Sequence, residues 1–217
     1  TVADLAAAHD ADVVVVVNPN NPDGRIVPPR DLATAAARLA ARGGWLVVDE
    51  AFADLDPVES LCGAVPPAGL VLRSFGKTYG LAGLRLGFAV AAEPLAGLVR
   101  RGLGPWAVSG PAIAVGRHAL ADSGWRREAA AARGRDAARL DAVLEAAGGR
   151  VVGGTKLFRT ADFSDGPALF GRLGRAGIFV RRFEAAPARL RLGLPPDEAA
   201  WTRLAAALGG PGLTARH

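Results

Sequence analysis

Lys77 is one of only two lysines among the 26 basic residues of this chain, and it is the residue whose type most clearly suggests chemistry. Arginine serves almost everywhere else, but a guanidinium cannot form a Schiff base because it stays protonated at neutral pH. Lys77 lies in a glycine-rich segment, with the hydroxyl of Ser74 three residues before it and the guanidinium of Arg85 eight residues after it. Both groups suit a phosphate. The segment therefore predicts an amine that holds a phosphorylated aldehyde cofactor.

Apolar runs and turn residues predict the elements around this segment. The expected strands are residues 13–17, 45–48, 70–73 and 86–90, and a helix opened by a proline pair is expected at about 28–41. The run at 13–17 is continuously β-branched, so we expect it to be buried on both faces of a sheet. Strand, helix and strand in this order favour a mostly parallel α/β sheet.

Polar residues follow three of these strands. Asn21 lies in the loop after the first strand, Asp49 ends the second, and Lys77 follows the third. In parallel α/β sheets, ligands gather at the carboxyl ends of the strands. The sequence therefore predicts one site to which Asn21, Asp49 and Lys77 all contribute.

The C-terminal half predicts a smaller α+β domain. Beyond residue 148 the expected strands are 151–152, 157–159, 178–181 and 190–192, with helices at about 167–176 and 197–208. Ahead of this domain, helices are expected at about 93–101 and at 111–147 with a break near 122–124. We expect a cofactor-binding large domain over 1–108, linking helices over 109–147 and a small domain over 148–217.

Composition excludes several functional classes. The net charge of +5 comes from scattered arginines, which argues against nucleic-acid binding. Cys62 is the single cysteine, so neither an internal disulfide nor a zinc site is expected. Apolar runs fall far short of the roughly 20 residues that span a bilayer, and no signal-peptide pattern is present. We expect a cytoplasmic protein without a metal.

Four segments in order carry a family resemblance: Asn-Pro-Asn-Asn-Pro-Asp-Gly (18–24), Asp-Glu-Ala-Phe (49–52), Ser-Phe-Gly-Lys (74–77) with the distal Arg85, and Leu-Arg-Leu (190–192). With them the chain resembles the fold-type I, pyridoxal-phosphate-dependent enzymes of the class I/II aminotransferase family. The resemblance implies a pyridoxal 5'-phosphate cofactor and a large α/β domain, incomplete here at its N-terminus. The family's N-terminal segment, which supplies a glycine-rich phosphate loop and a stacking aromatic ring, has no counterpart, so we expect the chain to be part of a longer protein.

The resemblance also implies a role for each site residue. Lys77 would form the Schiff base with the cofactor and later act as the base for proton transfer. Asp49 would keep the pyridinium nitrogen protonated, and Asn21 would hydrogen-bond the phenolic oxygen. Ser74 and Arg85 would bind the cofactor phosphate.

One further arginine is implied to bind substrate. Arg191 matches the family residue that clamps the substrate α-carboxylate, a bidentate pairing that lysine could not reproduce. Arg189 lies two residues earlier and would share its face of a strand, so the choice between them depends on the family pattern. Phe52 departs from the tyrosine that many aminotransferases carry there, which removes one hydrogen bond to the cofactor.

Within the family, the sequence resembles threonine-phosphate decarboxylases of cobalamin biosynthesis, themselves similar to histidinol-phosphate aminotransferases. The resemblance implies decarboxylation of L-threonine O-phosphate to aminopropanol phosphate, and a homodimer. Arg181 and Arg182 are candidates for the substrate phosphate, although solvated strand-end charges explain them equally well. Transamination remains open, as do an inactive enzyme fragment and a ligand-sensing regulator domain.

Overall fold

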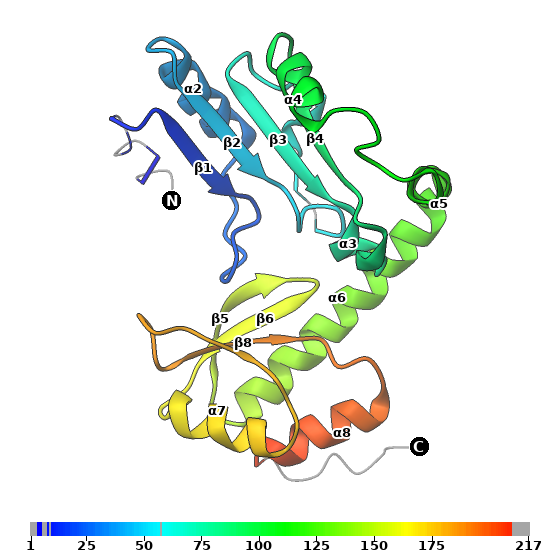
Figure 1. Cartoon of the computed structure of the whole chain (residues 1–217). Helices are drawn as coiled ribbons and strands as arrows, with labels where there is room; N and C mark the ends of the chain where they lie inside the picture. Colours follow the sequence, from blue (N-terminus) through cyan, green and yellow to red (C-terminus); the bar gives the residue numbers. More distant parts are fainter. Residues whose placement is uncertain (1–3, 6–7, 9, 57, 210–217) are drawn as a thin grey trace. The chain divides into compact units, whose positions relative to one another are not determined.

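Two four-stranded sheets organise the two structural units of the chain (Figure 1). The computed structural model describes residues 4–5, 8, 10–56 and 58–209. The first unit extends to Glu128 and the second begins at Ala129, a boundary that falls inside the long helix α6 (Ser123–Ala146). The functional division at 108 and 147 remains a prediction.

The first unit contains a mixed, mostly parallel sheet. Its elements in chain order are β1 (Val13–Val17), α2 (Pro29–Ala40), β2 (Trp45–Asp49), η1 (Leu61–Gly63), β3 (Gly69–Ser74), α3 (Phe75–Thr78), η2 (Ala82–Leu84), β4 (Gly87–Ala91), α4 (Leu95–Leu103) and α5 (Gly110–Ala121). The strand order is β1-β2-β3-β4, in which β1, β2 and β3 are parallel and β4 is antiparallel to β3. The predicted α/β fold is confirmed.

Helix α2 and one face of this sheet form the first hydrophobic core. Leu32, Ala36 and Leu39 recur at helical spacing along α2 and are all buried. They share a cluster with residues from the neighbouring strands: Leu46, Val48 and Val71. The core thus fixes which side chains of each strand point toward α2 and which point away.

The opposite face of the sheet is open at β1. Val13 and Val15 are 51% and 64% exposed, whereas Val14 and Val16 pack against the core cluster. The prediction that this strand is buried on both faces is therefore wrong for the described part of the chain. The physical reason is that α2 covers only the face to which Val14 and Val16 point.

The second unit is an antiparallel sheet packed against helices. Beside α6, its elements are β5 (Arg150–Thr155), β6 (Phe158–Asp162), α7 (Gly166–Arg175), β7 (Arg181–Arg182), β8 (Arg189–Gly193) and α8 (Glu198–Ala207). The strand order is β5-β6-β8-β7. Its core joins all three helices to β8 through Leu140, Leu144, Leu169, Leu173, Leu190, Leu192, Trp201 and Leu204. The predicted α+β character is confirmed.

One strand is shorter than the sequence predicts. Residues 178–181 are expected to be extended, but β7 contains only Arg181 and Arg182. The preceding residues instead cap α7: Gly177 has a positive φ of 68°, and the N–H of Ile178 donates to the carbonyl of Leu173 at 2.9 Å. This capping geometry uses the backbone groups that a longer strand would need.

No helix in the described ranges is both long enough and apolar enough to cross a bilayer.

Asp162 is the central charge of the second sheet. Arg150 on β5 and Arg189 on β8 are its cross-strand partners. Arg189 forms two hydrogen bonds with the carboxylate, at 2.7 and 3.0 Å, and Arg150 lies 2.7 Å from it. The hydrogen bonds from Arg189 lower the pKa of Asp162 below its ordinary value of 3.8, although partial burial opposes this shift.

Replacing Asp162 with Asn should lower the free energy of unfolding near pH 7 by about 1 kcal/mol, because a charge-assisted pairing is lost while the shape is kept. The folded pKa is depressed, so the stabilising contribution of the carboxylate is complete above pH 3.8 and is lost as pH falls through the folded pKa. Denaturant unfolding of both proteins near pH 7 and at successively lower pH measures the difference. A difference in unfolding free energy between the two proteins that stays constant as pH is lowered would contradict this account.

Candidate active site

Strand register places Asp49 and Ser74 on one face of the first sheet. Asp49 pairs with Val17 on one side and with Leu72 on the other, and Ser74 follows Leu72 by two residues. Because side chains alternate along a strand, Asp49, Leu72 and Ser74 point to the face opposite α2. Among the described residues, the Asp49 carboxylate accepts a hydrogen bond from the N–H of Ala51 at 2.9 Å.

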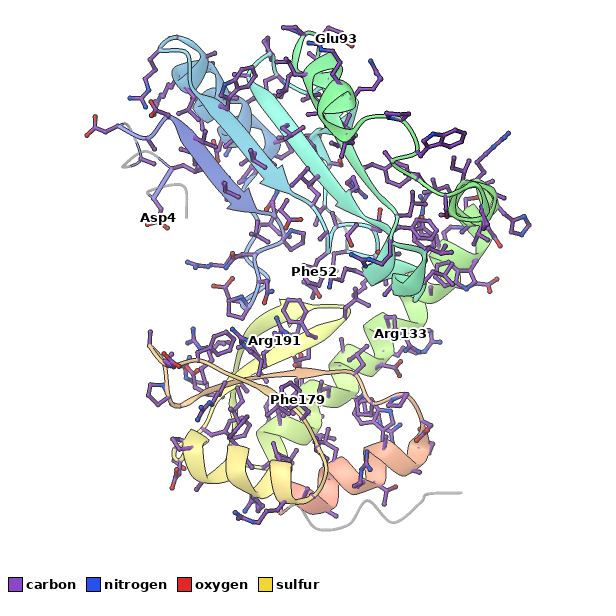
Figure 2. The ribbon with its side chains drawn as sticks, in the orientation of Figure 1. Asp4, Phe52, Glu93, Arg133, Phe179 and Arg191 are labelled. Carbon is purple, nitrogen blue, oxygen red and sulfur yellow. The ribbon has the colours of Figure 1, made fainter. Side chains whose placement is uncertain are left out.

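Lys77 lies on the single turn of α3, directly after Ser74. Phe75 and Thr78 of this turn are buried, whereas Lys77 is exposed. Its Nζ lies 5.9 Å from the centroid of the Phe52 ring, which belongs to the loop after β2 (Figure 2). Phe52 thus faces the amine with an aromatic ring that has no hydroxyl.

Arg85 ends η2 in the left-handed region, with a φ of 52°. Its Nη1 donates to the carbonyl of Ala82 at 3.1 Å, and the side chain is exposed. Gly76 allows η2 to approach α3, because a Cβ at this position would lie 2.9 Å from the Cα of Ala82. The segments that carry Lys77 and Arg85 are therefore packed directly against each other.

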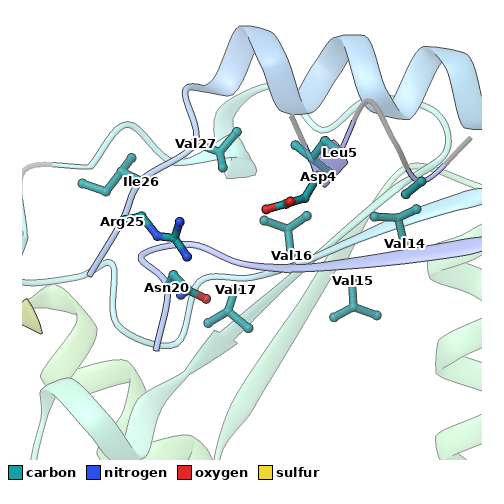
Figure 3. Close-up of a pocket in the computed structure, with 11 residues that line it drawn as sticks. Asp4, Leu5, Val14, Val15, Val16, Val17, Asn20, Arg25, Ile26 and Val27 are labelled. Atoms are coloured by element: carbon teal, nitrogen blue, oxygen red, sulfur yellow. The ribbon is translucent and has the colours of Figure 1, made fainter. Parts of the chain in front are cut away.

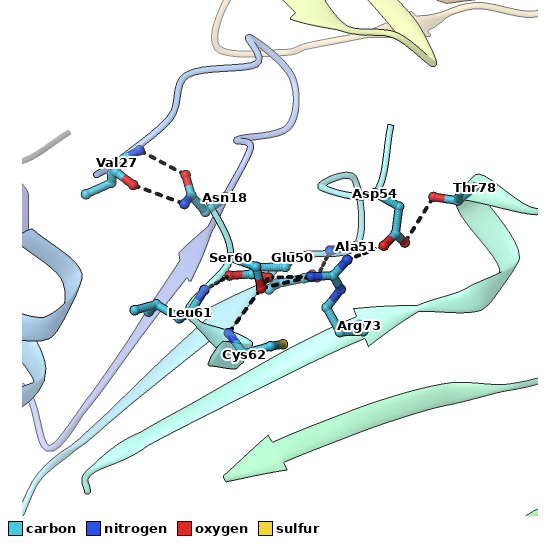
Figure 4. Close-up of polar contacts among 11 residues, drawn as sticks. Asn18, Val27, Glu50, Ala51, Asp54, Ser60, Leu61, Cys62, Arg73 and Thr78 are labelled. Atoms are coloured by element: carbon cyan, nitrogen blue, oxygen red, sulfur yellow. Dashed lines mark hydrogen bonds and ion pairs between the residues drawn. The ribbon is translucent and has the colours of Figure 1, made fainter. Parts of the chain in front are cut away.

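The loop that carries Asn21 is closed by a buried asparagine. The Asn18 side chain donates to the carbonyl of Val27 at 3.1 Å and accepts from the N–H of Val27 at 2.9 Å (Figure 4). The backbone N–H of Asn18 donates to the carbonyl of Asp49 at 2.8 Å. Asn21 itself is exposed. The loop is thus anchored at its base to the residue that ends β2.

A cavity of about 660 Å³ lies along β1 and the same loop (Figure 3). Asp4, Val16 and Arg25 are among the residues that line it. Asp49, Ser74, Lys77 and Arg85 do not line it. We therefore assign it no part in the site.

A buried polar network lies behind the site and was not anticipated from the sequence. Glu50 is fully buried and accepts hydrogen bonds from Arg73 (2.7 Å), from the N–H of Leu61 (2.9 Å) and from the hydroxyl of Ser60 (2.5 Å). Arg73 also pairs with Asp54, as Figure 4 shows. Burial alone would lower the pKa of Arg73, but Asp54 and Glu50 hold it above its ordinary value. The signal in the sequence is Arg73, a charged residue directly after the apolar run Leu70-Val71-Leu72.

In the second unit, Arg191 and Arg189 have different partners. Arg189 is paired with the carboxylate of Asp162. Arg191 lies opposite Arg181 in the antiparallel ladder, and its guanidinium lies 5.1 Å from the centroid of the Phe158 ring. Burial, together with the nearby charge of Arg181, lowers the pKa of Arg191.

The sequence matches the profile of the family "Aminotransferase class I and II" over residues 2–208, nearly the whole chain. The chain belongs to this aminotransferase family. The first sheet is accordingly part of an aminotransferase-family large domain, with Asp49, Ser74 and Lys77 at its carboxyl edge.

Two curated relatives with high sequence identity are threonine-phosphate decarboxylases. The chain is 49% identical to a threonine-phosphate decarboxylase of Pseudomonas aeruginosa over 92% of its own length and 60% of that protein. It is 48% identical to a threonine-phosphate decarboxylase of a Sinorhizobium species over 94% of its own length and 61% of that protein. The chain thus spans about three-fifths of these curated relatives.

A solved structure in the same family shares the fold. The crystal structure of histidinol-phosphate aminotransferase from Sinorhizobium meliloti, in complex with pyridoxal 5'-phosphate, superposes with a TM-score of 0.81 at 27% identity. The match covers 94% of this chain and 59% of that one.

Asn18 offers a direct test of how the loop of this aminotransferase-family site is held. Replacing Asn18 with Asp removes the donor to the Val27 carbonyl and sets a buried carboxylate against it, so we expect the free energy of unfolding near pH 7 to fall by about 2 kcal/mol. Burial raises the pKa of such a carboxyl group, and its protonated form can donate again. The loss should therefore shrink as pH falls from 7 toward that raised pKa. Denaturant unfolding across this pH range measures the loss of stability. Equal stability of the two proteins near pH 7 would show that the hydrogen bond from the Asn18 side chain to the Val27 carbonyl contributes nothing.

Proposed function

We propose that the protein is a pyridoxal-phosphate-dependent decarboxylase that converts L-threonine O-phosphate to aminopropanol phosphate in cobalamin biosynthesis. The observation that carries the proposal is the shared sheet face of Asp49 and Ser74, with Lys77 three residues beyond Ser74. The 49% identity to a threonine-phosphate decarboxylase supports this reaction over others in the family.

The chemistry of these side chains fits the cofactor. The Asp49 carboxylate would pair with the ring nitrogen and keep its proton in place. The Ser74 hydroxyl and the Arg85 guanidinium suit the phosphate, and Asn21 would donate to the phenolic oxygen. Lys77 carries the only primary amine in this group of side chains and would bond to the aldehyde carbon through Nζ.

When bound, pyridoxal phosphate supplies an electron sink for the bond that breaks at the substrate α-carbon. Asp49 supports this role because its charge holds the proton on the ring nitrogen. Decarboxylation would break the bond between the substrate α-carbon and its carboxylate, and carbon dioxide would leave. Lys77 would then deliver a proton from Nζ to the α-carbon, which gains a hydrogen in place of the carboxylate. The product keeps its phosphate and its amine.

Two arginines of the second unit suit an anionic substrate. Arg191 and Arg181 are opposite each other, and like charges in this arrangement destabilise a sheet. An anion bound between the two guanidinium groups would relieve this repulsion. Arg191 would bind the α-carboxylate and Arg181 the phosphate, whereas Arg182 stacks on Phe170 at 5.2 Å.

We further propose that two copies of the chain associate. Trp106 is 96% exposed and Leu103 is 64% exposed, and Leu98 and Ile113 of the flanking helices are also exposed. Large exposed apolar side chains in one region of a surface are typical of protein interfaces. We propose that a second copy of the chain covers these side chains, which makes the protein a homodimer. A cytoplasmic location remains a prediction.

The cofactor proposal predicts a covalent link at Lys77. Purified protein mixed with pyridoxal phosphate should show an absorbance band near about 420 nm that borohydride removes irreversibly. Lys77→Ala should lack the band, because no other amine is proposed to reach the aldehyde. Peptide mapping of the reduced protein identifies the modified lysine, with Lys156 as the internal control. A band that survives in Lys77→Ala, or label found on Lys156 instead, would overturn the proposed site.

The substrate proposal predicts that substitution of Arg191 affects the KM for substrate and that substitution of the nearby Arg189 does not. Arg191→Lys should raise the KM for threonine phosphate by about tenfold or more, because lysine cannot reproduce the bidentate pairing. Arg189→Lys is the matched control, since Arg189 is occupied by Asp162, and its KM should change little. Release of carbon dioxide from threonine phosphate measures both variants. Transfer of the amino group without carbon dioxide release would instead identify an aminotransferase.

A further inference from the structure

The buried polar network lies on the face of the sheet opposite the proposed cofactor contacts. Glu50 follows Asp49, and Arg73 precedes Ser74, so the alternation of strand side chains sends each pair to opposite faces. On the turn of α3, Thr78 follows Lys77 and is buried, whereas Lys77 is exposed. Three of the proposed cofactor contacts thus each have a network member as their immediate sequence neighbour.

The turn that carries Lys77 has little to hold it in place by itself. Helix α3 has four residues, and the N–H of Tyr79 reaches the carbonyl of Phe75 only at 3.4 Å. A single turn is not stable on the strength of its own hydrogen bonds. Its position therefore depends on contacts beyond the turn: the close packing of Gly76 against Ala82, the buried ring of Phe75 and the side chain of Thr78.

Thr78 connects the turn to the ionic part of the network. Its hydroxyl donates to one oxygen of Asp54 at 3.1 Å, and the other oxygen of Asp54 pairs with Arg73. The same arginine pairs with Glu50, which is fully buried and also bonded to Ser60 and to the loop backbone. The contacts run without a break from the end of β2, through β3, to the residue beside Lys77.

Such a network adds little net stability to the fold. Removing carboxylates and a guanidinium from water costs nearly as much as their pairing returns, so apolar residues would serve a purely structural purpose equally well. Fully satisfied networks do, however, fix one geometry. Here every member has its partners, and the geometry being fixed is that of the turn beside Ser74.

We propose that Glu50, Arg73, Asp54 and Thr78 are positioning residues that hold the amine of Lys77 where it can bond to the cofactor aldehyde. The inference rests on the proposed function, since it concerns the same amine. It goes further by assigning a role to side chains that would not touch the cofactor. Thr78 is the last link, because its hydroxyl joins the turn to the charged groups.

A matched pair of substitutions at Thr78 separates position from stability. Thr78→Val keeps the shape and removes the hydroxyl, whereas Thr78→Ser keeps the hydroxyl and removes a methyl group. Both should lower the melting temperature. Thr155→Val is the control elsewhere, because Thr155 is also buried and accepts a hydrogen bond from the N–H of Leu157 in the second unit.

The measurement compares two ligands, pyridoxal phosphate and pyridoxamine phosphate. The first can bond to Lys77, whereas the second has no aldehyde and cannot, so the ratio of their affinities isolates the covalent step. We expect Thr78→Val to reduce this ratio by about tenfold while the affinity for pyridoxamine phosphate stays close to that of the wild type. Thr78→Ser and Thr155→Val should keep the wild-type ratio.

Each outcome bears on one claim. A wild-type protein without any preference for pyridoxal phosphate would overturn the proposed function and, with it, this inference. A wild-type preference that Thr78→Val leaves intact, or affinities for both ligands that fall together, would overturn the positioning role alone. If Thr78→Val does not fold, Asp54→Asn replaces it, since this variant keeps the shape, weakens the pairing with Arg73 and should lower the ratio in the same direction.

Discussion

Alternation of side chains along β2 and β3 is the constraint on which the rest of the first unit depends. A strand cannot send two successive side chains to the same face, so Asp49 and Ser74 can share the open face only if Glu50 and Arg73 share the other. Two charged side chains are then directed toward the buried side of the sheet. The structure resolves this by pairing them with each other.

This pairing explains why the loop after β2 has its observed course. Arg73 pairs with both Glu50 and Asp54, so it cannot by itself satisfy all the carboxylate oxygens. The loop supplies two further donors to Glu50, the hydroxyl of Ser60 and the N–H of Leu61. An unsatisfied carboxylate at this depth would cost several kcal/mol. The path of the loop is therefore determined by the hydrogen-bonding needs of Glu50, and Phe52 in the same loop comes to lie beside the Lys77 amine.

The sequence predicted those features that depend on local pattern. Lys77 stood out because lysine is rare in this chain, and Asp49 because it ends a strand in a sheet whose parallel order was predictable. The network was not predictable, since the pairing of Glu50 with Arg73 spans 23 residues and requires the strand register. The exposure of Val15 was unpredictable for a related reason: β-branched residues predict a strand, but the burial of a strand residue depends on what packs against each face of the sheet. Local pattern also could not reveal that Ile178 would cap a helix.

In the second sheet, two arginines on the same strand have different surroundings. Arg189 and Arg191 alternate with buried leucines on β8 and point to the same face, so neither composition nor periodicity separates them. Their cross-strand partners do, because Arg189 lies opposite an aspartate and Arg191 opposite a second arginine. A guanidinium already neutralised by a carboxylate has little capacity left for a second anion. Arg191 is half-buried and lies opposite Arg181, and burial together with that nearby charge lowers its pKa. Under the proposed function, this difference in cross-strand partners is the reason for assigning the substrate carboxylate to Arg191 rather than to Arg189.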